Sequence, residues 1–404
     1  MSRYDIVVFG ATGSAGRAIA SYLDRVAAAN GIRWAVAGRN ASALDALRRS
    51  LRTKPGAIVA DALDDAAVRR MVGETRVLLA ALGPFVLYGE PALRACAEAG
   101  VDYVDITGET AHVRRMIDRY HARAEHSGAR IVPLCGFDSV PSDLGAFLLA
   151  EHGRARGAEL RQVKGYFQYA GGYNAGTAAS TRELWRRPAD LQAMRDPILL
   201  NPHETQTDAE RAGNADPAGP IADQDLGRWV APFFMAPINT RVVRRSAALF
   251  REWGEPYGAG FRYQEYWDTN SPLGFVAASA ASMGMAAYQL MARQPGAADW
   301  IAPFARGAFP DAMRPANPYF RAQFVGKYDD GTSTWAEVAD RGDPATDVTA
   351  KIVSEAALAL ADDGADRTST RRAGILTPAT ALGLRLVSRL RNAGVGMRCP
   401  ACRV

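Results

Sequence analysis

A short apolar run, DIVVFG (5–10), leads directly into a glycine-rich turn and then into a helical pattern, SAGRAIASYL. The turn places Gly10, Gly13 and Gly16 at intervals of three residues. A strand that passes through glycines into a helix brings backbone N–H groups and the positive end of the helix dipole to one point, which suits a pyrophosphate. The spacing differs from the usual G-x-G-x-x-G. It is therefore the strand–turn–helix context that predicts a dinucleotide site here.

We expect each glycine of this turn to have its own task. Gly10 makes the turn, Gly13 lets a pyrophosphate approach the backbone, and Gly16 allows the helix to pack closely on the strand. Thr12 and Ser14 add short hydroxyl groups without bulk, so we include them among the cofactor-binding residues. Glycines also close turns for purely structural reasons, and the rest of the chain has to support the assignment.

The first third of the chain alternates apolar strand-like runs with helical patterns. Five further runs follow the first one, at 32–38, 56–60, 76–83, 101–106 and 129–136. Such βαβα order predicts a parallel sheet with helices on both faces, which is a Rossmann-type α/β fold. Ligands of such sheets bind at the carboxyl ends of the strands.

The end of the second strand distinguishes the two nicotinamide dinucleotides. An NAD site usually places Asp or Glu there for the ribose 2′-hydroxyl. Here the strand ends in AGRN, with Arg39 and Asn40 and no carboxylate. A guanidinium supplies a charge and paired donors for a 2′-phosphate. We therefore predict NADP, with Arg39 and Asn40 among its ligands. The alternative is that Arg39 stacks on the adenine or faces solvent.

Three polar turns follow the next three strands, and their sequences are GPFVLYGEP, DITGE and CGFDSVPSD. Gly83 and Pro84 of the first turn are expected to leave room beside the nicotinamide ribose. Asp138 of the third turn is included as a further cofactor-binding residue. Glu109, in the second turn, is more typical of a helix cap than of a functional group.

Beyond Pro141 the alternation ends. Later runs are typical of strands, at 159–169, 258–268, 319–330 and 334–342. They predict a second, α+β domain with an antiparallel sheet. We place the dinucleotide-binding domain at 1–140 and a substrate or dimerisation domain at 141–365. The remaining residues, 366–404, are expected to form a C-terminal helix that packs back on the first domain.

Two segments of the second domain stand out. Residues 197–228 are polar, rich in Pro and Gly, and too long for an ordinary connection, so they form either an ordered lid or a floppy insertion. Residues 273–292 contain no charge. Because Ala, Ser and Gly dominate them, they favour a packed helix, with a lipid-facing helix or a membrane span as alternatives.

Charge and cysteine content exclude several classes of protein. The formal net charge is +5 for 404 residues and no block of Lys and Arg occurs, so a nucleic acid partner is not expected. The N-terminus shows no secretory signal, which predicts a cytoplasmic protein. Four cysteines do not suggest a disulfide framework. Cys399 and Cys402 form a C-x-x-C pair, which we interpret as part of an exposed tail, with a redox-active pair or half of a metal site as alternatives. No metal site is predicted.

Several longer stretches resemble the saccharopine dehydrogenase-like oxidoreductases, and most closely their trans-acting enoyl reductase branch. They include YDIVVFGATGSAGR, LGPFVLYGEPALRACAEAGVDYVDITGE, CGFDSVPSDLGA and GILTPATALGLRLVSRL. The resemblance implies an NADP-binding Rossmann domain, a second α+β domain and a returning C-terminal helix. It also implies reduction of a carbon–carbon double bond in a polyketide-derived lipid precursor. The implied partners are a small or carrier-bound acyl substrate and a polyketide synthase or acyl carrier. A homodimer and peripheral contact with the inner membrane stay open.

An enoyl reductase needs a hydride, a stabilised enolate oxygen and a proton donor. The histidines stand in no catalytic motif, and His112 belongs to a helix that is expected to lie on the surface. We therefore select tyrosines as proton donors, Tyr88 first and Tyr173 second. A run of arginines at 238–246 either meets an anionic carrier group or forms a solvated helix face. Two other functions stay open, an imine or amino-acid oxidoreductase and a non-catalytic NADP-binding scaffold.

Overall fold

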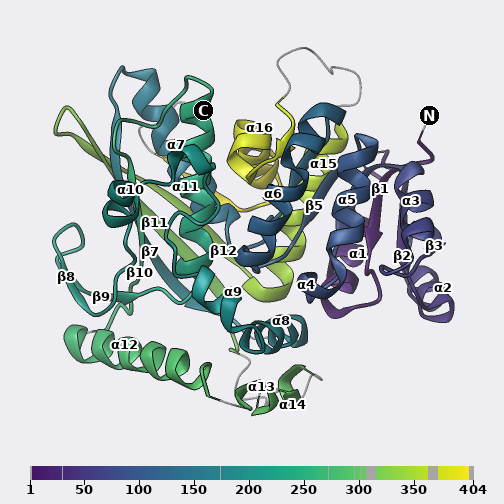
Figure 1. Cartoon of the computed structure of the whole chain (residues 1–404), viewed down its shortest axis with the longest axis horizontal. Coiled ribbons are helices and arrows are strands. Elements are labelled where there is room, and N and C mark those ends of the chain that lie inside the picture. Colours follow the sequence, from purple (N-terminus) through teal and green to yellow (C-terminus); the bar gives the residue numbers. More distant parts are fainter. Residues whose placement is uncertain are drawn as a thin grey trace.

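The structure is a computed structural model that describes residues 2–29, 31–172, 174–271, 273–294, 296–300, 302–305, 315–362 and 372–399. Within these residues the chain forms two seven-stranded sheets. Figure 1 shows the first sheet on the right and the second on the left, with helices from the later part of the chain between them.

The first sheet is parallel throughout. Its strands are β1 (Tyr4–Phe9), β2 (Trp34–Gly38), β3 (Gly56–Val59), β4 (Thr75–Ala80), β5 (Asp102–Asp105), β6 (Arg130–Val132) and β13 (Gly374–Ile375). They lie in the order β13-β6-β5-β4-β1-β2-β3, so the strand order reverses between β1 and β4, where sheets of this kind bind dinucleotides. The six strands predicted from the sequence are confirmed. The seventh, β13, comes from the C-terminal part of the chain.

Helices cover both faces of this sheet. They are α1 (Ser14–Val26), α2 (Ala41–Ser50), α3 (Asp65–Gly73), α4 (Phe85–Tyr88), α5 (Glu90–Ala99), α6 (Thr110–Ser127) and, from far along the chain, α15 (Thr349–Asp362). Ile6 and Val8 point to the core shared with α15, whereas Val7 and Phe9 point to the core shared with α3, α5 and α6. Both faces are buried, which is why β1 is a continuous apolar run without alternation.

The second sheet is mixed, which corrects the antiparallel sheet expected from the sequence. Its strands are β7 (Leu160–Ala170), β8 (Ile221–Asp223), β9 (Arg228–Pro232), β10 (Arg262–Trp267), β11 (Tyr319–Tyr328), β12 (Ser333–Arg341) and β14 (Gly396–Arg398), in the order β14-β12-β11-β7-β10-β9-β8. β7 and β10 run parallel, with Tyr263 opposite Val163. Parallel neighbours require a long connection, and the helices between residues 171 and 261 supply it.

The other helices belong to this second part of the chain. They are α7 (Val140–Ala155), α8 (Ala175–Trp185), α9 (Pro188–Ala193), α10 (Asp208–Gly213), α11 (Ala236–Glu252), α12 (Gly274–Met291), α13 (Ala297–Trp300), α14 (Ala302–Ala305) and α16 (Pro378–Asn392). α7 packs against β7, β11 and β12 and also against α11 and α16. It is the central helix of the junction between the two sheets.

The C-terminal segment takes part in both sheets. β13 pairs with β6 in the first sheet, and β14 pairs with β12 in the second. Between them, α16 packs against α15, α7 and α11. Cys399, expected in an exposed tail, is buried just after β14, whereas Cys402 lies outside the described residues.

The segment 197–228 is ordered and carries α10 and β8. The arginines of α11 hold it in place, which corrects both expectations for them. Arg241, Arg244 and Arg245 are each no more than 3% exposed. The first two pair with Asp216, and the third donates to backbone carbonyls. They are therefore neither a solvated face nor available for a carrier group.

Helix α12 differs most from the expectation of a packed helix. It packs against β9, and only Ala278 among its residues is buried. Figure 1 shows it at the lower edge of the molecule, outside the two sheets. No helix in the described part of the chain is long and apolar enough to cross a bilayer. The sequence pattern did not reveal this exposure because burial depends on the neighbours that the fold supplies.

The contact between α7 and β11 predicts a strong effect of one added methyl group. A Cβ on Gly145 would lie 2.4 Å from two ring carbons of Phe324. Gly145→Ala should therefore lower the free energy of unfolding by about 1–3 kcal/mol, measured by urea denaturation. In the control Gly73→Ala, at the end of α3, no heavy atom lies within 4 Å of the new Cβ, and stability should hold or rise by up to about 1 kcal/mol. Equal stability of the two variants would contradict this packing.

Candidate functional site

Two glycines of the turn after β1 cannot be replaced without a clash. Gly10 has a φ of +88°, and a Cβ there would lie 2.5 Å from the carbonyl oxygen of Ala81, just after β4. A Cβ on Gly16 would lie 2.2 Å from the carbonyl oxygen of Gly10. The turn is therefore pressed against β4 on one side and against α1 on the other.

Gly13 is different, because it is exposed and nearly free of neighbours. A Cβ there would meet only the carbonyl oxygen of Gly10, at 3.4 Å. Gly13 is the N-cap of α1, it has no side chain to satisfy the first N–H groups, and the first turn of the helix carries no acidic residue. This open cradle at a helix N-terminus fits a pyrophosphate.

The hydroxyl residues of the turn lie beside this cradle. Ser14 is the exposed first residue of α1. The carbonyl oxygen of Thr12 accepts a hydrogen bond from Arg17 Nε at 3.0 Å. Thr12 Oγ1 would lie 3.8 Å from a Cβ on Gly38, at the end of β2. Thr12 thus links the turn to the strand end that precedes Arg39.

Arg39 and Asn40 follow β2 at the same edge of the sheet. Both are exposed. Asn40 is the N-cap of α2, and its Oδ1 accepts a hydrogen bond from the N–H of Ala43 at 3.0 Å. Among the residues that the structure describes, Arg39 has no hydrogen bond or ion pair. Its guanidinium is therefore available for an anionic ligand.

Glu109 fixes the turn that carries Gly83 and Pro84. Its carboxylate accepts hydrogen bonds from the N–H groups of Phe85 and Val86, at 2.9 and 2.6 Å. Ser180 Oγ donates a third, at 2.7 Å. Burial raises the pKa of Glu109 and these bonds oppose the shift. Glu109 precedes α6 but does not cap it with its side chain; instead it caps α4.

Helix α8 lies across this edge of the first sheet. It contacts α1, and Ser180 Oγ would lie 3.8 Å from a Cβ on the exposed Gly83. Ser180 was not predicted as a site residue, because a serine in an Ala-Ser-Thr stretch carries no distinguishing signal. The cofactor edge is thus bounded by α1, the α4 turn and α8.

Several carboxyl groups are buried in the interior of the protein. Asp105, Asp143 and Glu265 are among them, and burial raises the pKa of each to about 7. All three accept hydrogen bonds. Asp105, for example, accepts from the N–H groups of Thr107 and Leu134, so it ties the end of β5 to the segment after β6. These three groups hold the structure together.

Asp138 is different from these carboxyl groups. No described residue donates a hydrogen bond to it, and the residue is half-buried. A Cβ on Gly108 would lie 3.4 Å from Asp138 Oδ2 and 3.3 Å from Ile238 Cδ1 of α11. Burial raises the pKa of Asp138 to about 7, and its charge contributes to raising the pKa of Tyr169 on β7. Asp138 therefore lies where the first sheet meets the second.

The two tyrosines selected from the sequence are placed differently. Tyr88 is half-buried at the end of α4, and it makes no hydrogen bond with any residue that the structure describes. It is three residues from the Pro84–Phe85 peptide held by Glu109. Tyr173 lies outside the described residues.

A pocket of about 420 Å³ lies next to the α4 turn, and Val86 belongs to its lining. Arg115 lines it too and pairs with Asp190 at 2.7 Å. His112, expected on an exposed helix, is buried here. Burial, and then the charge of Arg115, lower the pKa of this imidazole to about 4, so it is neutral at physiological pH.

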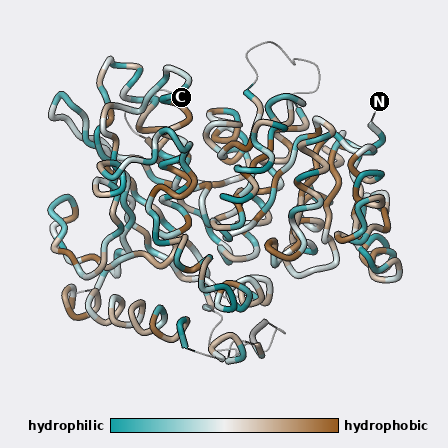
Figure 2. The backbone as a smooth tube through the Cα atoms, viewed as in Figure 1, coloured by the Kyte–Doolittle hydropathy of each residue, from teal (hydrophilic) through white to brown (hydrophobic). Residues whose placement is uncertain are grey.

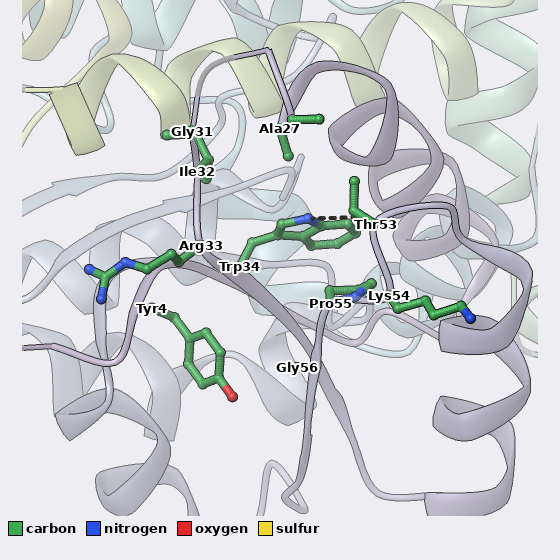
Figure 3. Close-up of a pocket in the computed structure, with 11 residues that line it drawn as sticks. Tyr4, Ala27, Gly31, Ile32, Arg33, Trp34, Thr53, Lys54, Pro55 and Gly56 are labelled. Carbon is green, nitrogen blue, oxygen red and sulfur yellow. Dashed lines mark hydrogen bonds between the residues drawn. The ribbon is translucent and has the colours of Figure 1, made fainter.

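Another pocket, of about 400 Å³, lies at the opposite edge of the first sheet. Figure 3 shows Tyr4 and Trp34 in it, with the indole N–H of Trp34 directed at Thr53 Oγ1, 3.2 Å away. Tyr4, Trp34 and Gly56 are the first residues of β1, β2 and β3. Because dinucleotides bind at the carboxyl ends of such strands, this pocket is not the cofactor site.

Comparison with known families identifies the first domain. Residues 6–132 match the saccharopine dehydrogenase NADP binding domain. This range runs from β1 to the end of β6 and contains the glycine turn, Arg39 and the Glu109 contacts. The cofactor predicted from the end of the second strand, NADP, is confirmed at the level of the family.

Relatives cover nearly the whole chain. A trans-acting enoyl reductase of Mycobacterium ulcerans is 34% identical over 97% of this chain and 96% of its own length. The Mycobacterium tuberculosis protein Rv2449c, to which the same activity is provisionally assigned, is 37% identical over 98% of this chain and 97% of its own length. A trans-acting enoyl reductase of the same organism is 33% identical over 98% of this chain.

A solved structure supports the architecture of both sheets. Saccharopine dehydrogenase (L-Glu forming) of Saccharomyces cerevisiae superposes with a TM-score of 0.54 and covers 98% of this chain and 99% of that one. With 12% identity, this likeness concerns the fold alone. By its full-length relatives, the chain belongs to the trans-acting enoyl reductase family, and it begins with a saccharopine dehydrogenase-type NADP-binding domain.

Proposed function

We propose that the protein is an NADPH-dependent enoyl reductase that reduces the conjugated double bond of an acyl thioester. The observation that carries this proposal is the full-length likeness to trans-acting enoyl reductases, combined with the open cradle at Gly13. The cradle would hold the pyrophosphate, and Arg39 would meet the 2′-phosphate. Gly83, which is exposed beside Ser180, would leave room near the nicotinamide.

The reaction divides between the cofactor and the chain. NADPH supplies a hydride when bound, and reduction at the β-carbon leaves negative charge on the thioester oxygen and an α-carbon that needs a proton. The chain has to hold the acyl group against the α4 turn, exclude water, and provide that proton. Glu109 helps to hold the acyl group, because its hydrogen bonds to the N–H groups of Phe85 and Val86 fix the α4 turn.

Asp138 is the group we assign as proton donor. A proton donor works best when its pKa is near the operating pH, and burial brings the pKa of Asp138 to about 7. Its carboxyl is not occupied by other described residues, whereas Asp143 and Glu265 are. From the sequence, Asp138 was predicted to bind the cofactor, and we propose the role of proton donor in its place. Tyr88 stays the second candidate.

The alternative of an amino-acid-forming oxidoreductase finds less support. Such an enzyme needs arginines that clamp substrate carboxylates, and the arginine run of α11 was the candidate. Arg241 and Arg244 are paired with Asp216 inside the protein, and Arg245 is bonded to two backbone carbonyls. Only a measurement of activity distinguishes a non-catalytic scaffold from these two enzymes.

We further propose that the acyl group arrives on a carrier, as part of a polyketide synthase. Arg115, Arg119 and Arg187 line the pocket beside the α4 turn. They pair with Asp190, Glu90 and Glu183, so an anionic carrier arm would have to compete with these carboxylates for the three arginines. A cytoplasmic location and peripheral contact with the inner membrane stay predictions from the sequence.

The proposed activity is tested by NADPH oxidation. We expect turnover with α,β-unsaturated acyl thioesters, followed at 340 nm, and none with pairs of keto acids and amines. Turnover with the second set alone would establish the amino-acid chemistry. Tight NADPH binding without turnover on either set would establish the scaffold.

The role of Arg39 is tested by cofactor preference. Arg39→Ala removes a charged hydrogen bond to the 2′-phosphate, which is worth about 1.5–3 kcal/mol, so the Kd for NADPH should rise about 10- to 150-fold. The Kd for NADH should change less than threefold. Arg49→Ala, on the exposed face of α2, is the matched control and should leave both values unchanged. Equal losses for both cofactors in Arg39→Ala would reject the 2′-phosphate contact.

The role of Asp138 is tested by rate and pH together. Asp138→Asn should lower kcat at pH 7 by about 100-fold or more without changing the Kd for NADPH. The donor must be protonated, so the wild-type rate should fall as pH rises through about 7, and the variant should lose this dependence.

Tyr88→Phe is the comparison. It should keep kcat within about threefold of the wild type and retain the pH profile. If Tyr88→Phe is inactive and Asp138→Asn is not, the tyrosine is the proton donor and our assignment is wrong.

A further inference from the structure

Helix α12, with its N-cap, carries an apolar stripe on its outer face. The stripe consists of Leu273, Val276, Ala280, Met283, Ala287 and Leu290. All six residues are exposed, and the fraction reaches 72% for Met283. Their spacing of 3, 4, 3, 4 and 3 is that of positions a and d of a heptad, which is the seam through which one helix packs on another.

The fold itself does not use this stripe. α12 contacts the rest of the protein through the face that carries Ala278, its one buried residue. Phe275 packs against Trp229 with ring centroids 4.8 Å apart, although it is 52% exposed. Figure 2 shows the helix in pale and brown colours along most of its length. No charged residue occurs between Asp268 and Arg293.

The stripe is complementary to itself when two helices run antiparallel. Its spacing is symmetric about the point between Ala281 and Ser282. A second copy turned by 180° therefore places Leu273 opposite the partner's Leu290. In the same way Val276 meets the partner's Ala287, and Ala280 meets the partner's Met283. Each inner layer pairs a larger side chain with an alanine, which lets the two helices approach closely, and a leucine pair closes each end.

Charge also favours a second copy over other occupants. A helix that binds a lipid surface usually carries Lys and Arg on a polar face beside its apolar one, and α12 has none. The Ala, Ser and Gly residues that dominate it contribute little to insertion into a bilayer. A charged partner would leave its charges unpaired against this uncharged face. Another uncharged α12 leaves none.

We propose that α12 is a self-association surface through which two copies of this chain pair as antiparallel helices. Its 18 residues give a length of about 27 Å, and with a width of about 10 Å one face covers about 270 Å² in projection. Standard interfaces bury about 800 Å² per partner. The association is therefore reversible and depends on protein concentration.

Analytical ultracentrifugation of the full chain between 1 and 100 μM tests the surface. The wild type should shift from monomer toward dimer over this range. Met283→Asp places a charge in the central layer and should weaken dimerisation at least tenfold while leaving the Tm unchanged. Gln289→Asp is the matched control, because it adds the same charge to the same helix at an exposed position off the stripe. It should dimerise like the wild type.

Cysteine cross-linking tests the direction of pairing. Two single variants, Ala280→Cys and Met283→Cys, are mixed and oxidised. The yield of disulfide-linked dimer should be at least tenfold higher than that of the wild type. In a parallel pair Ala280→Cys alone would link to itself, and that result would overturn the antiparallel arrangement. If the wild type is still a monomer at 100 μM, the proposal is wrong. It is also wrong if monomeric wild type binds vesicles of anionic phospholipid and Met283→Asp does not, because the stripe would then be a lipid-binding surface.

Discussion

The carboxyl group of Asp143 joins three helices that lie far apart in the sequence. It accepts a hydrogen bond from Ser246 Oγ of α11 at 2.5 Å and one from the N–H of Ala379 in α16 at 2.7 Å. The neighbouring Ser142 donates to Glu265 of β10 at 2.6 Å. Buried polar groups cost most when they lose their partners. The position of α7 between the two sheets therefore depends on these bonds, and the edge that carries Asp138 depends on α7.

The first sheet was predictable because both of its faces are buried. Runs such as IVVF in β1 are apolar at every position, and each is followed by a helix whose pattern is local. β13 was missed because two residues, Gly374 and Ile375, carry no pattern of their own and become a strand only beside β6. The direction of β10 was missed for a similar reason, since its neighbour β7 is almost a hundred residues earlier.

The candidate site was predictable only as far as backbone conformation dictates residue type. Gly10 and Gly16 are required by contacts that the strand–turn–helix geometry implies. Glu109 was recognised as a possible cap, but the helix that it caps lies earlier in the chain and meets it only in the folded protein. The surroundings of Asp138 likewise come from α11 and β7, which are distant in the sequence. Its raised pKa therefore could not be predicted from the local sequence.

The division of the C-terminal segment between the two sheets has a consequence for synthesis. During translation, the first six strands leave the ribosome while the face that α15 covers still lacks its helix, and both β13 and β14 are still to come. The apolar side chains of that face, such as Ile6 and Leu79, then lack the part of their native cover that α15 supplies. Such exposed surface promotes aggregation of nascent chains. The NADP-binding half therefore reaches its native packing only after almost the entire polypeptide has been made.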